Sequence, residues 1–343
     1  MRDLARAPAP DAAVPVPPAE LWSKDVGRAA AGPVAVGDSV VVTTTADKRL
    51  TVMRRDNGQI VWQRRLHGPG AGGPLFTRER VFAGSADLEG RFESVDLLTG
   101  KRRWRRTVGP VVGPIALRDS TVFAATAAGV LFALGARHGE VHWQRHFPAG
   151  LHSGATVIDN RVFVATDDSL YLVDAGTGAA VAAAAAVGAV RSAPAVSGNV
   201  LVITSPAGAI AGYDPQTLTT RWSVDVGSPL FGGAAIARDT AFAVTVDGDL
   251  WRIPLHSPDA GWAQHLRRPM RTTPAPVRDG VLLGTVDGAL MLVGADTDTP
   301  LWSIALDGPL EFPPVVDRGV MLLMDGRGTV YAWETGGSGA GEP

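Results

Sequence analysis

Three histidines have the spacing most suggestive of chemistry: His138, His142 and His146 lie four positions apart. On an α-helix this spacing places three imidazoles on one face and favours a transition-metal site. On a β-strand four residues span about 13 Å, too far for two side chains to share one ion. The chain has no cysteine, which excludes thiolate metal sites, disulfides and cysteine nucleophiles. The choice between a metal site and surface histidines therefore depends on the element that carries them.

Known catalytic motifs are missing from the chain. It contains no G-x-S-x-G, H-E-x-x-H, Walker-type or EF-hand pattern, and the Asp-Gly pairs at 247–248 and 287–288 are predicted turns. Lys and Arg number 32 against 34 Asp and Glu, so the chain lacks the basic excess of a nucleic-acid coat. We therefore predict no catalytic, cofactor-binding or metal-binding residue, and no nucleic-acid partner.

The elements that position any site follow from a repeat of about forty residues. Tryptophans recur 39 to 42 residues apart, with one double gap centred on Ala182, at Trp22, Trp62, Trp104, Trp143, Trp222, Trp262 and Trp302. A second series keeps the same period, at Pro33, Pro74, Pro114, Ala155, Pro194, Ala234, Pro274 and Pro313. Two series in step indicate a structural repeat.

Each repeat contains four short β-strands. Residues 112–143 show runs rich in Val, Phe, Leu and Ala, separated by turn sequences, with no helical periodicity. Eight repeats of four antiparallel strands predict an all-β fold, an eight-bladed β-propeller. The Trp of each outer strand is predicted to seal one blade against the next. Because 140–146 becomes an outer strand, the histidines are interpreted as surface residues.

The first strand has no blade of its own. Residues 21–26 resemble the outer strands at 221–226 and 301–306, whereas the last repeat lacks an outer strand. We therefore predict that the N-terminal strand completes the last blade and closes the ring. Deletion of residues 1–26 is expected to destabilise the whole domain.

The phrase VFVATDDSLYLVDAGTG at 162–178, and related phrases at 81–104 and 200–222, resemble the pyrroloquinoline-quinone-like (PQQ-like) propeller repeat. The resemblance covers about residues 21–335. It implies one of two branches: quinone-dependent dehydrogenases, or non-catalytic scaffolds similar to the outer-membrane assembly lipoprotein BamB. The dehydrogenases are considerably longer, so length favours the second branch.

The residues expected of the enzyme branch are missing. The resemblance implies a divalent cation held by carboxylate and Asn oxygens, with adjacent cysteines over the quinone. The only asparagines, Asn57, Asn160 and Asn199, fall in predicted turns. We therefore predict a non-enzymatic scaffold for protein–protein interaction, without cofactor, in cell-envelope or outer-membrane protein assembly. The alternatives are a PQQ-dependent dehydrogenase-like or other ligand-binding propeller, or the sensor domain of a larger receptor.

A binding surface is predicted at the mouth of the central funnel, on one loop face. Three residues before the proline series, the repeat places exposed cationic and apolar side chains that would bind an acidic or extended peptide: His152, Arg191, Phe231, Arg271 and Leu310. The alternative is that these are solvated loop residues. The chain is expected to act as a monomer.

Two further regions depart from the average. Residues 48–106 hold 14 Lys and Arg against 6 Asp and Glu, and basic residues flank Trp62 and Trp104. They predict a solvated rim that discourages edge pairing, or docking to an anionic surface. The outer strand of blade four, 179–190, is mostly alanine and lacks the Trp. Its packing against the next blade is therefore expected to be weaker, through degeneracy or as a docking edge.

The predicted domain organisation is a Pro- and Ala-rich disordered linker at 1–20, the propeller at 21–336 and a flexible tail at 337–343. Residues 1–20 contain no apolar core of a signal peptide and no lipid-attachment cysteine. The resemblance nevertheless implies an extracytoplasmic, periplasmic protein, with membrane contact only peripheral or through an anchor missing from this sequence.

Overall fold

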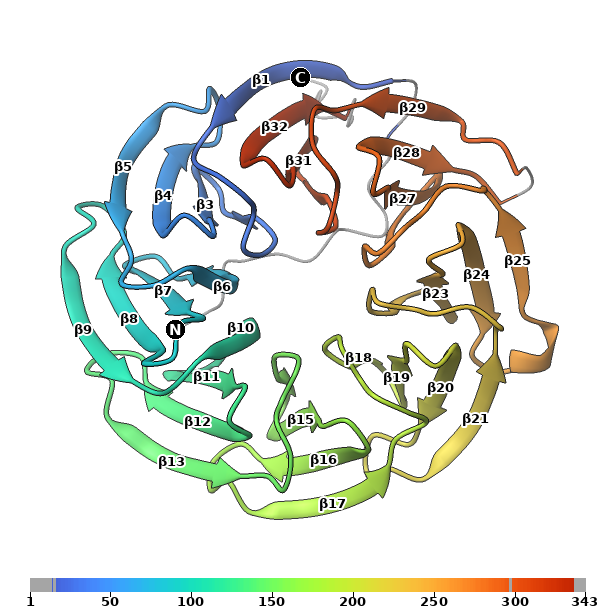
Figure 1. The fold of residues 1–343 in the computed structure, drawn as a ribbon, viewed down its shortest axis with the longest axis horizontal. Helices are drawn as coiled ribbons and strands as arrows, with labels where there is room; N and C mark the ends of the chain where they lie inside the picture. Colours follow the sequence, from blue (N-terminus) through green and yellow to red (C-terminus); the bar gives the residue numbers. More distant parts are fainter. Residues whose placement is uncertain (1–13, 15–16, 296–297, 336–343) are drawn as a thin grey trace, which may run out of the picture.

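The computed structural model describes residue 14 and residues 17–295 and 298–335. These residues form eight four-stranded antiparallel sheets arranged around a central axis (Figure 1), which confirms the predicted eight-bladed propeller. In the described ranges the one helical element is the 3₁₀ turn η1 (Pro258–Ala260). No helix among them is long and apolar enough to span a bilayer.

The first four blades run from the axis outwards in chain order. Blade 1 comprises β2 (Ala35–Val36), β3 (Val40–Thr44), β4 (Arg49–Arg54) and β5 (Ile60–Arg65). Blade 2 comprises β6 (Gly70–Phe76), β7 (Arg80–Ser85), β8 (Arg91–Asp96) and β9 (Arg102–Thr107). Blade 3 comprises β10 (Val111–Arg118), β11 (Thr121–Thr126), β12 (Val130–Gly135) and β13 (Val141–His146). Blade 4 comprises β14 (Thr156–Ile158), β15 (Arg161–Ala165), β16 (Ser169–Asp174) and β17 (Ala180–Ala185).

The other blades repeat this order, except that the last borrows its outer strand from the chain start. Blade 5 comprises β18 (Ala195–Ser197), β19 (Val200–Thr204), β20 (Ala209–Tyr213) and β21 (Thr220–Asp225). Blade 6 comprises β22 (Ala235–Ala237), β23 (Thr240–Val244), β24 (Asp249–Pro254) and β25 (Trp262–His265). Blade 7 comprises β26 (Ala275–Val277), β27 (Gly280–Gly284), β28 (Ala289–Val293) and β29 (Trp302–Ala305). Blade 8 comprises β30 (Val315–Asp317), β31 (Val320–Met324), β32 (Thr329–Glu334) and β1 (Ala19–Asp25).

The burial pattern of the strands follows from this stacking. Middle strands such as β11 and β12 are buried along most of their length, because both faces of a blade are covered by neighbouring blades. Outer strands such as β5 and β21 alternate exposed and half-buried residues. The apolar core is accordingly divided into separate clusters, several of which combine strands of two adjacent blades.

The ring is closed by the N-terminal strand, as the sequence predicts. Strand β1 pairs antiparallel with β32, with Trp22 opposite Ala332 and Ser23 opposite Tyr331 (Figure 1). A buried ion pair joins blade 1 to blade 8 at this seam: Arg55 Nη1 lies 2.8 Å from Asp317 Oδ2, with both side chains at most 8% exposed. Arg55 also donates to the carbonyl oxygens of Gly37 and Asp317.

Residues 14 and 17–20, which belong to the predicted disordered linker, are part of the propeller. Strand β1 begins at Ala19, and Val14 is completely buried in the core of blades 7 and 8. The Val14 backbone N–H donates to Asp279 Oδ2 at 3.1 Å. The other residues up to 16, and the predicted tail at 337–343, lie outside the described residues.

Four tryptophans contact the following blade in one way. Each indole N–H donates to a backbone carbonyl of that blade's outer turn, at 2.8 to 3.0 Å: Trp22 to Arg55, Trp62 to Leu97, Trp104 to Ala136 and Trp143 to Ala175. Each ring also packs against a turn glycine. At Gly178 the fit is so close that an added Cβ would lie 2.6 Å from the Trp143 ring.

The contact between blades 4 and 5 reverses this arrangement of large and small residues. Ala182 occupies the strand position of the Trp, and Leu218 of blade 5 occupies the turn position of Gly178. The two turn residues correspond because the Leu218 N–H donates to the Asp214 carbonyl as the Gly178 N–H donates to the Asp174 carbonyl. Leu218 is fully buried in the same cluster as Ala182. The expectation of weaker packing at this alanine-rich strand overlooked Leu218, which fills the space from the other side.

The last three tryptophans of the forty-residue series also differ from the first four. Trp302 is buried and donates to the carbonyl of Val14 at 3.4 Å. Trp222 is half-buried, and its indole nitrogen has no partner among the described residues. Trp262 is 41% exposed and packs under Arg252, whose guanidinium carbon lies 4.9 Å from the ring centroid. Blade 6 has an irregular outer turn with η1 where blades 1 to 4 have a glycine turn.

Candidate functional site

The mouth of the funnel carries charged and aromatic side chains on four consecutive blades. The loops that enter the inner strands of blades 4 to 7 place one partly or fully exposed residue each at the same register position: His152, Arg191, Phe231 and Arg271. These four residues are called the cationic arc below. They are four of the five residues that the sequence predicts for partner binding.

Asp167 joins two members of the arc. One of its carboxylate oxygens, Oδ1, lies 3.1 Å from His152 Nε2 and 3.2 Å from Arg191 Nη2. Asp167 stands in the turn between β15 and β16, which faces the funnel beside the arc. Sequence reasoning missed this residue, although it is the one acidic residue at a turn position that other blades fill with Ala, Pro, Val or Gly. The carboxylate neutralises part of the positive charge and holds two side chains at a fixed separation.

The other two members form a cation–π pair. The Arg271 guanidinium carbon lies 5.2 Å from the centroid of the Phe231 ring. Phe231 is 44% exposed, and Val286 in the β27–β28 turn on the same face is 42% exposed. Arg271 has no ion pair within the described residues, so its charge is available to a ligand. A surface that combines an exposed ring, an exposed guanidinium and an apolar side chain suits a peptide with acidic and apolar residues.

Leu310 does not belong to this surface, which corrects the prediction. It is 1% exposed and lies in the core of blades 7 and 8. Strand pairing places Val315 opposite Leu322, as Ala275 lies opposite Leu282, so the repeat position in blade 8 is Pro314 and not Pro313. The neighbouring prolines made the predicted register one residue too early. Glu311, which is exposed, therefore occupies the mouth position in blade 8.

Blades 1 to 3 contribute only small or apolar residues to the mouth. Ala31, Ala71 and Val112 occupy the corresponding register positions. The inner loops of these blades approach one another through backbone: a Cβ added to Gly72, which has a φ of +70°, would lie 1.4 Å from the carbonyl oxygen of Gly113. The mouth is therefore asymmetric, with its charge on one side.

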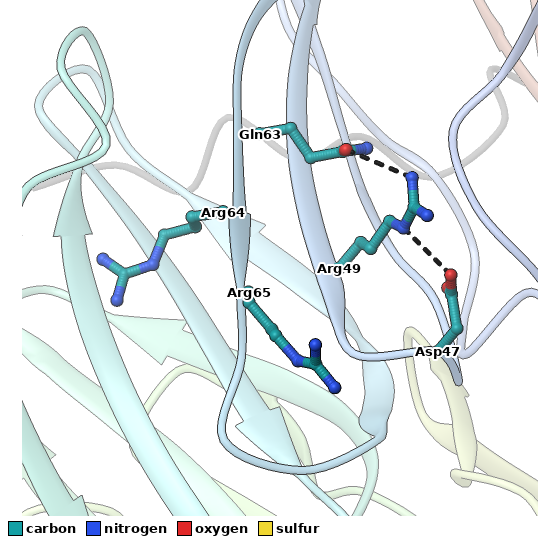
Figure 2. Close-up of a pocket in the computed structure, with 5 residues that line it drawn as sticks. All are labelled: Asp47, Arg49, Gln63, Arg64 and Arg65. Carbon is teal, nitrogen blue, oxygen red and sulfur yellow. Dashed lines mark hydrogen bonds and ion pairs between the residues drawn. The ribbon is translucent and has the colours of Figure 1, made fainter.

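A second surface lies at the basic outer strands of blades 1 and 2. A pocket of 350 Å³ is lined by Asp47, Arg49, Gln63, Arg64 and Arg65 (Figure 2). Arg49 pairs with Asp47 at 2.9 Å and donates to Gln63 at 3.3 Å, whereas Arg64 points to the other side of β5. Arg65 has no ion pair within the part of the chain described. Of the three arginines in the lining, Arg49 is paired with Asp47 and Arg64 lies near Glu93, so the charge of Arg65 is the one left without a carboxylate among the residues described.

Several arginines of this rim hold the blades together. Arg64 donates to the Gly100 carbonyl at 2.9 Å, and Arg106 and Arg145 make the same bond to the turn of the next blade. Arg64 also lies 3.5 Å from Glu93, a buried carboxyl whose pKa is raised by burial against the opposing effect of nearby arginines. Much of the local positive charge therefore has a structural role in blade contacts.

The histidines and asparagines are located as the sequence predicts. His142 and His146 lie on the outer strand β13, and His142 contacts Thr121 Oγ1 at 3.2 Å. Asn57, Asn160 and Asn199 lie in turns. Within the described ranges, no group of three or more His, Asp or Glu side chains has the arrangement of a metal site.

Comparison with known proteins gives one family and one shared fold. The family model described as "Outer membrane protein assembly factor BamB" matches residues 17–149, 88–180 and 166–288. The outer membrane protein assembly factor BamB of Shewanella oneidensis is 25% identical over 191 residues, which are 48% of this chain and 48% of that protein. The chain thus matches about half the length of this curated relative.

Solved structures share the fold over most of the chain. BamB from Moraxella catarrhalis superposes with a TM-score of 0.79 at 19% identity, over 92% of this chain and 99% of that one. The computationally designed Ika8 protein superposes with a TM-score of 0.78 at 18% identity, again over 92% and 99%. The second similarity is to a designed protein, so the fold by itself carries no function.

Proposed function

The chain belongs to the family of the outer membrane protein assembly factor BamB, and from this membership we propose that it is a non-enzymatic scaffold that binds a protein partner during outer-membrane protein assembly. The proposed place of action is the cell envelope, outside the cytoplasm. The chain would act there as a monomer, because β1 of the same chain covers the edge of β32 that a second chain could otherwise pair with.

We propose the cationic arc as the partner-binding surface. The observation that carries this assignment is the exposed Phe231–Arg271 pair beside the Asp167-linked His152 and Arg191. Aromatic and arginine side chains dominate the energy of protein interfaces when they are presented on a rigid frame. The surface favours an extended peptide segment that carries acidic and apolar residues.

The test is site-specific photo-crosslinking in the native host. A photoreactive phenylalanine analogue at position 231 is expected to crosslink a component of the outer-membrane assembly machinery. The matched control carries the analogue at Leu98, which is 78% exposed on the opposite face. Crosslinks from position 98 but not from position 231 would place partner binding on the opposite face and contradict the proposal.

Substitution tests the same surface by affinity. The double variant R191A/R271A is expected to weaken binding of the crosslinked partner at least tenfold, because it removes the two guanidinium groups of the arc. The control R161A/R278A removes two arginines from the opposite face and is expected to change affinity less than twofold. Equal affinity of the two double variants would contradict the assignment.

A further inference from the structure

A small pocket with surplus positive charge lies on the face opposite the funnel mouth. It has a volume of 160 Å³ and is lined by Arg78, Glu79, Arg80, Asp96, Leu98 and Arg103. All six residues belong to blade 2, from the start of β7, the end of β8, the bulge of β9 and the turns between them. We call it the Arg80 pocket.

The guanidinium of Arg80 is left without partners in this pocket. Its Nε and Nη1 atoms are buried, and neither has a hydrogen-bond partner among the described residues. Burial, together with the charges of Arg103 and of Arg137 from blade 3, lowers the pKa of Arg80 against the opposing effect of the Glu79 and Asp96 carboxylates. An arginine remains charged at neutral pH even so. Buried donors of a charged group cost free energy unless an acceptor reaches them.

Asp96 faces Arg80 across the β7–β8 pair but is already occupied. Its Oδ2 lies 2.5 Å from Arg103 Nη2, and its Oδ1 accepts bonds from the Thr99 N–H and hydroxyl at 2.8 Å each. These bonds hold the pKa of Asp96 at about 2, led by the bond from Arg103. Neither Arg78 nor Arg80 forms an ion pair within the part of the chain described. With Glu79 also in the lining, the three arginines exceed the two carboxylates by one positive charge.

Other blades show that the framework does not require this surplus. In blade 5 the same carboxylate–arginine pair recurs, Asp214 to Arg221 at 2.5 Å, but Val200 stands at the position of Arg80. In blade 4, Arg161 stands opposite Asp174 as Arg80 stands opposite Asp96. There, the position of Arg78 is taken by an aspartate and that of Arg103 by a valine. Of these three blades, only blade 2 combines all three arginines.

We propose that the Arg80 pocket binds a tetrahedral oxyanion, a phosphate group held by Arg78, Arg80 and Arg103. Guanidinium donors of three arginines reach it from two chain segments, the β6–β7 turn with the start of β7 and the bulge of β9, which suits an anion with oxygens in several directions better than a planar carboxylate. The volume of 160 Å³ equals about five water molecules at roughly 30 Å³ each, enough for one phosphate group and too little for a nucleotide. A lipid headgroup and free phosphate share this chemistry. The proposal is independent of the partner-binding role of the cationic arc.

The experiment compares four proteins in buffers of equal ionic strength: wild type, R80Q, R78Q and the matched control R161Q. Isothermal titration with inorganic phosphate against a chloride background measures affinity, and co-sedimentation with phosphatidylcholine vesicles, with and without phosphatidylglycerol, measures headgroup binding. We expect R80Q to weaken binding at least tenfold, R78Q severalfold and R161Q less than twofold. Without phosphate, R80Q is expected to unfold at the wild-type temperature or higher, because an unpaired buried charge is lost.

The two ligands separate the sources of the phosphate group. Binding to both probes, with the same order of variants, identifies a lipid headgroup as the bound form, and binding to inorganic phosphate alone identifies the free ion. The proposal is overturned if wild type binds neither probe, or if R78Q binds as tightly as wild type. Arg78 is exposed, so its substitution is not expected to disturb folding. Preference for an acidic peptide over phosphate, lost in R80Q, would also overturn it.

Discussion

The contact between blades 4 and 5 makes a quantitative prediction about paired substitution. Leu218 is fully buried and adopts a left-handed backbone with a φ of +59°. Replacement by glycine removes a buried side chain at a cost of about 2–5 kcal/mol, and relieves about 1–2 kcal/mol of backbone strain. We therefore expect L218G to lower the free energy of unfolding by about 2 kcal/mol.

The partner substitution has the opposite geometry. In A182W the indole meets Leu218, and overpacking of this kind costs about 1–3 kcal/mol. In the double variant A182W/L218G the pair becomes that of Trp143 and Gly178, and the indole N–H can reach the Pro215 carbonyl as Trp143 reaches Ala175. The double variant should unfold with a free energy within about 1 kcal/mol of wild type, a coupling of about 3 kcal/mol.

Urea unfolding followed by far-ultraviolet circular dichroism measures all four proteins of the cycle, because this signal reports mainly the β-sheet backbone, whereas fluorescence would change with each added tryptophan. A matched A184W/L218G pair provides the control, since Ala184 lies two residues further along β17. Additive effects of A182W and L218G, or equal rescue by A184W, would refute the inference that the two blades exchanged the large and small positions.

Three further predictions concern closure and buried charge. Removal of residues 1–26 deletes β1, exposes the edge of β32 and loses the burial of Trp22, so the free energy of unfolding should fall by about 3 kcal/mol or more; a thermal melt like that of the full chain would contradict it. R55A leaves the buried Asp317 carboxylate without its guanidinium, which should cost about 3–5 kcal/mol in urea unfolding. The exposed neighbour provides the control, and R54A should change stability by less than about 0.5 kcal/mol. Burial raises the pKa of Glu93 above its ordinary 4.5, so its charge opposes folding as pH rises. E93Q should therefore be more stable than wild type at pH 7, with the difference lost below about pH 4; a less stable E93Q at pH 7 would show that the Arg64 contact outweighs burial.

The repeat made most of the fold predictable from sequence. A tryptophan every forty residues indicates one blade, because the large ring of one outer strand needs the turn of the next sheet beneath it. The unmatched strand at 21–26 predicted closure for the same reason: an outer strand without a sheet must pair with a sheet that lacks one. These inferences depend on local sequence patterns, which the chain repeats eight times.

The sites were less predictable because they depend on single residues outside the repeat. Two adjacent prolines shifted the inferred register in blade 8, so buried Leu310 was predicted in place of exposed Glu311. Leu218 compensates for Ala182 from a turn 36 positions away. Arg80 looks like any strand arginine until the commitment of Asp96 to Arg103 is visible. These contacts join residues that are far apart in the sequence and differ from blade to blade, so a pattern shared by all repeats does not reveal them.

The pairing of β1 with β32 also determines when the native state can form on the ribosome. The first strand must wait for a partner made about 300 residues later, which at about 5–20 residues per second is an interval of roughly 15–60 s. During that interval the hydrogen-bonding edge of β1 and the apolar ring of Trp22 stay open to other chains. A circularly permuted gene that joins β1 directly to β32 would make the two strands neighbours in synthesis and should shorten the period in which a holding chaperone is needed.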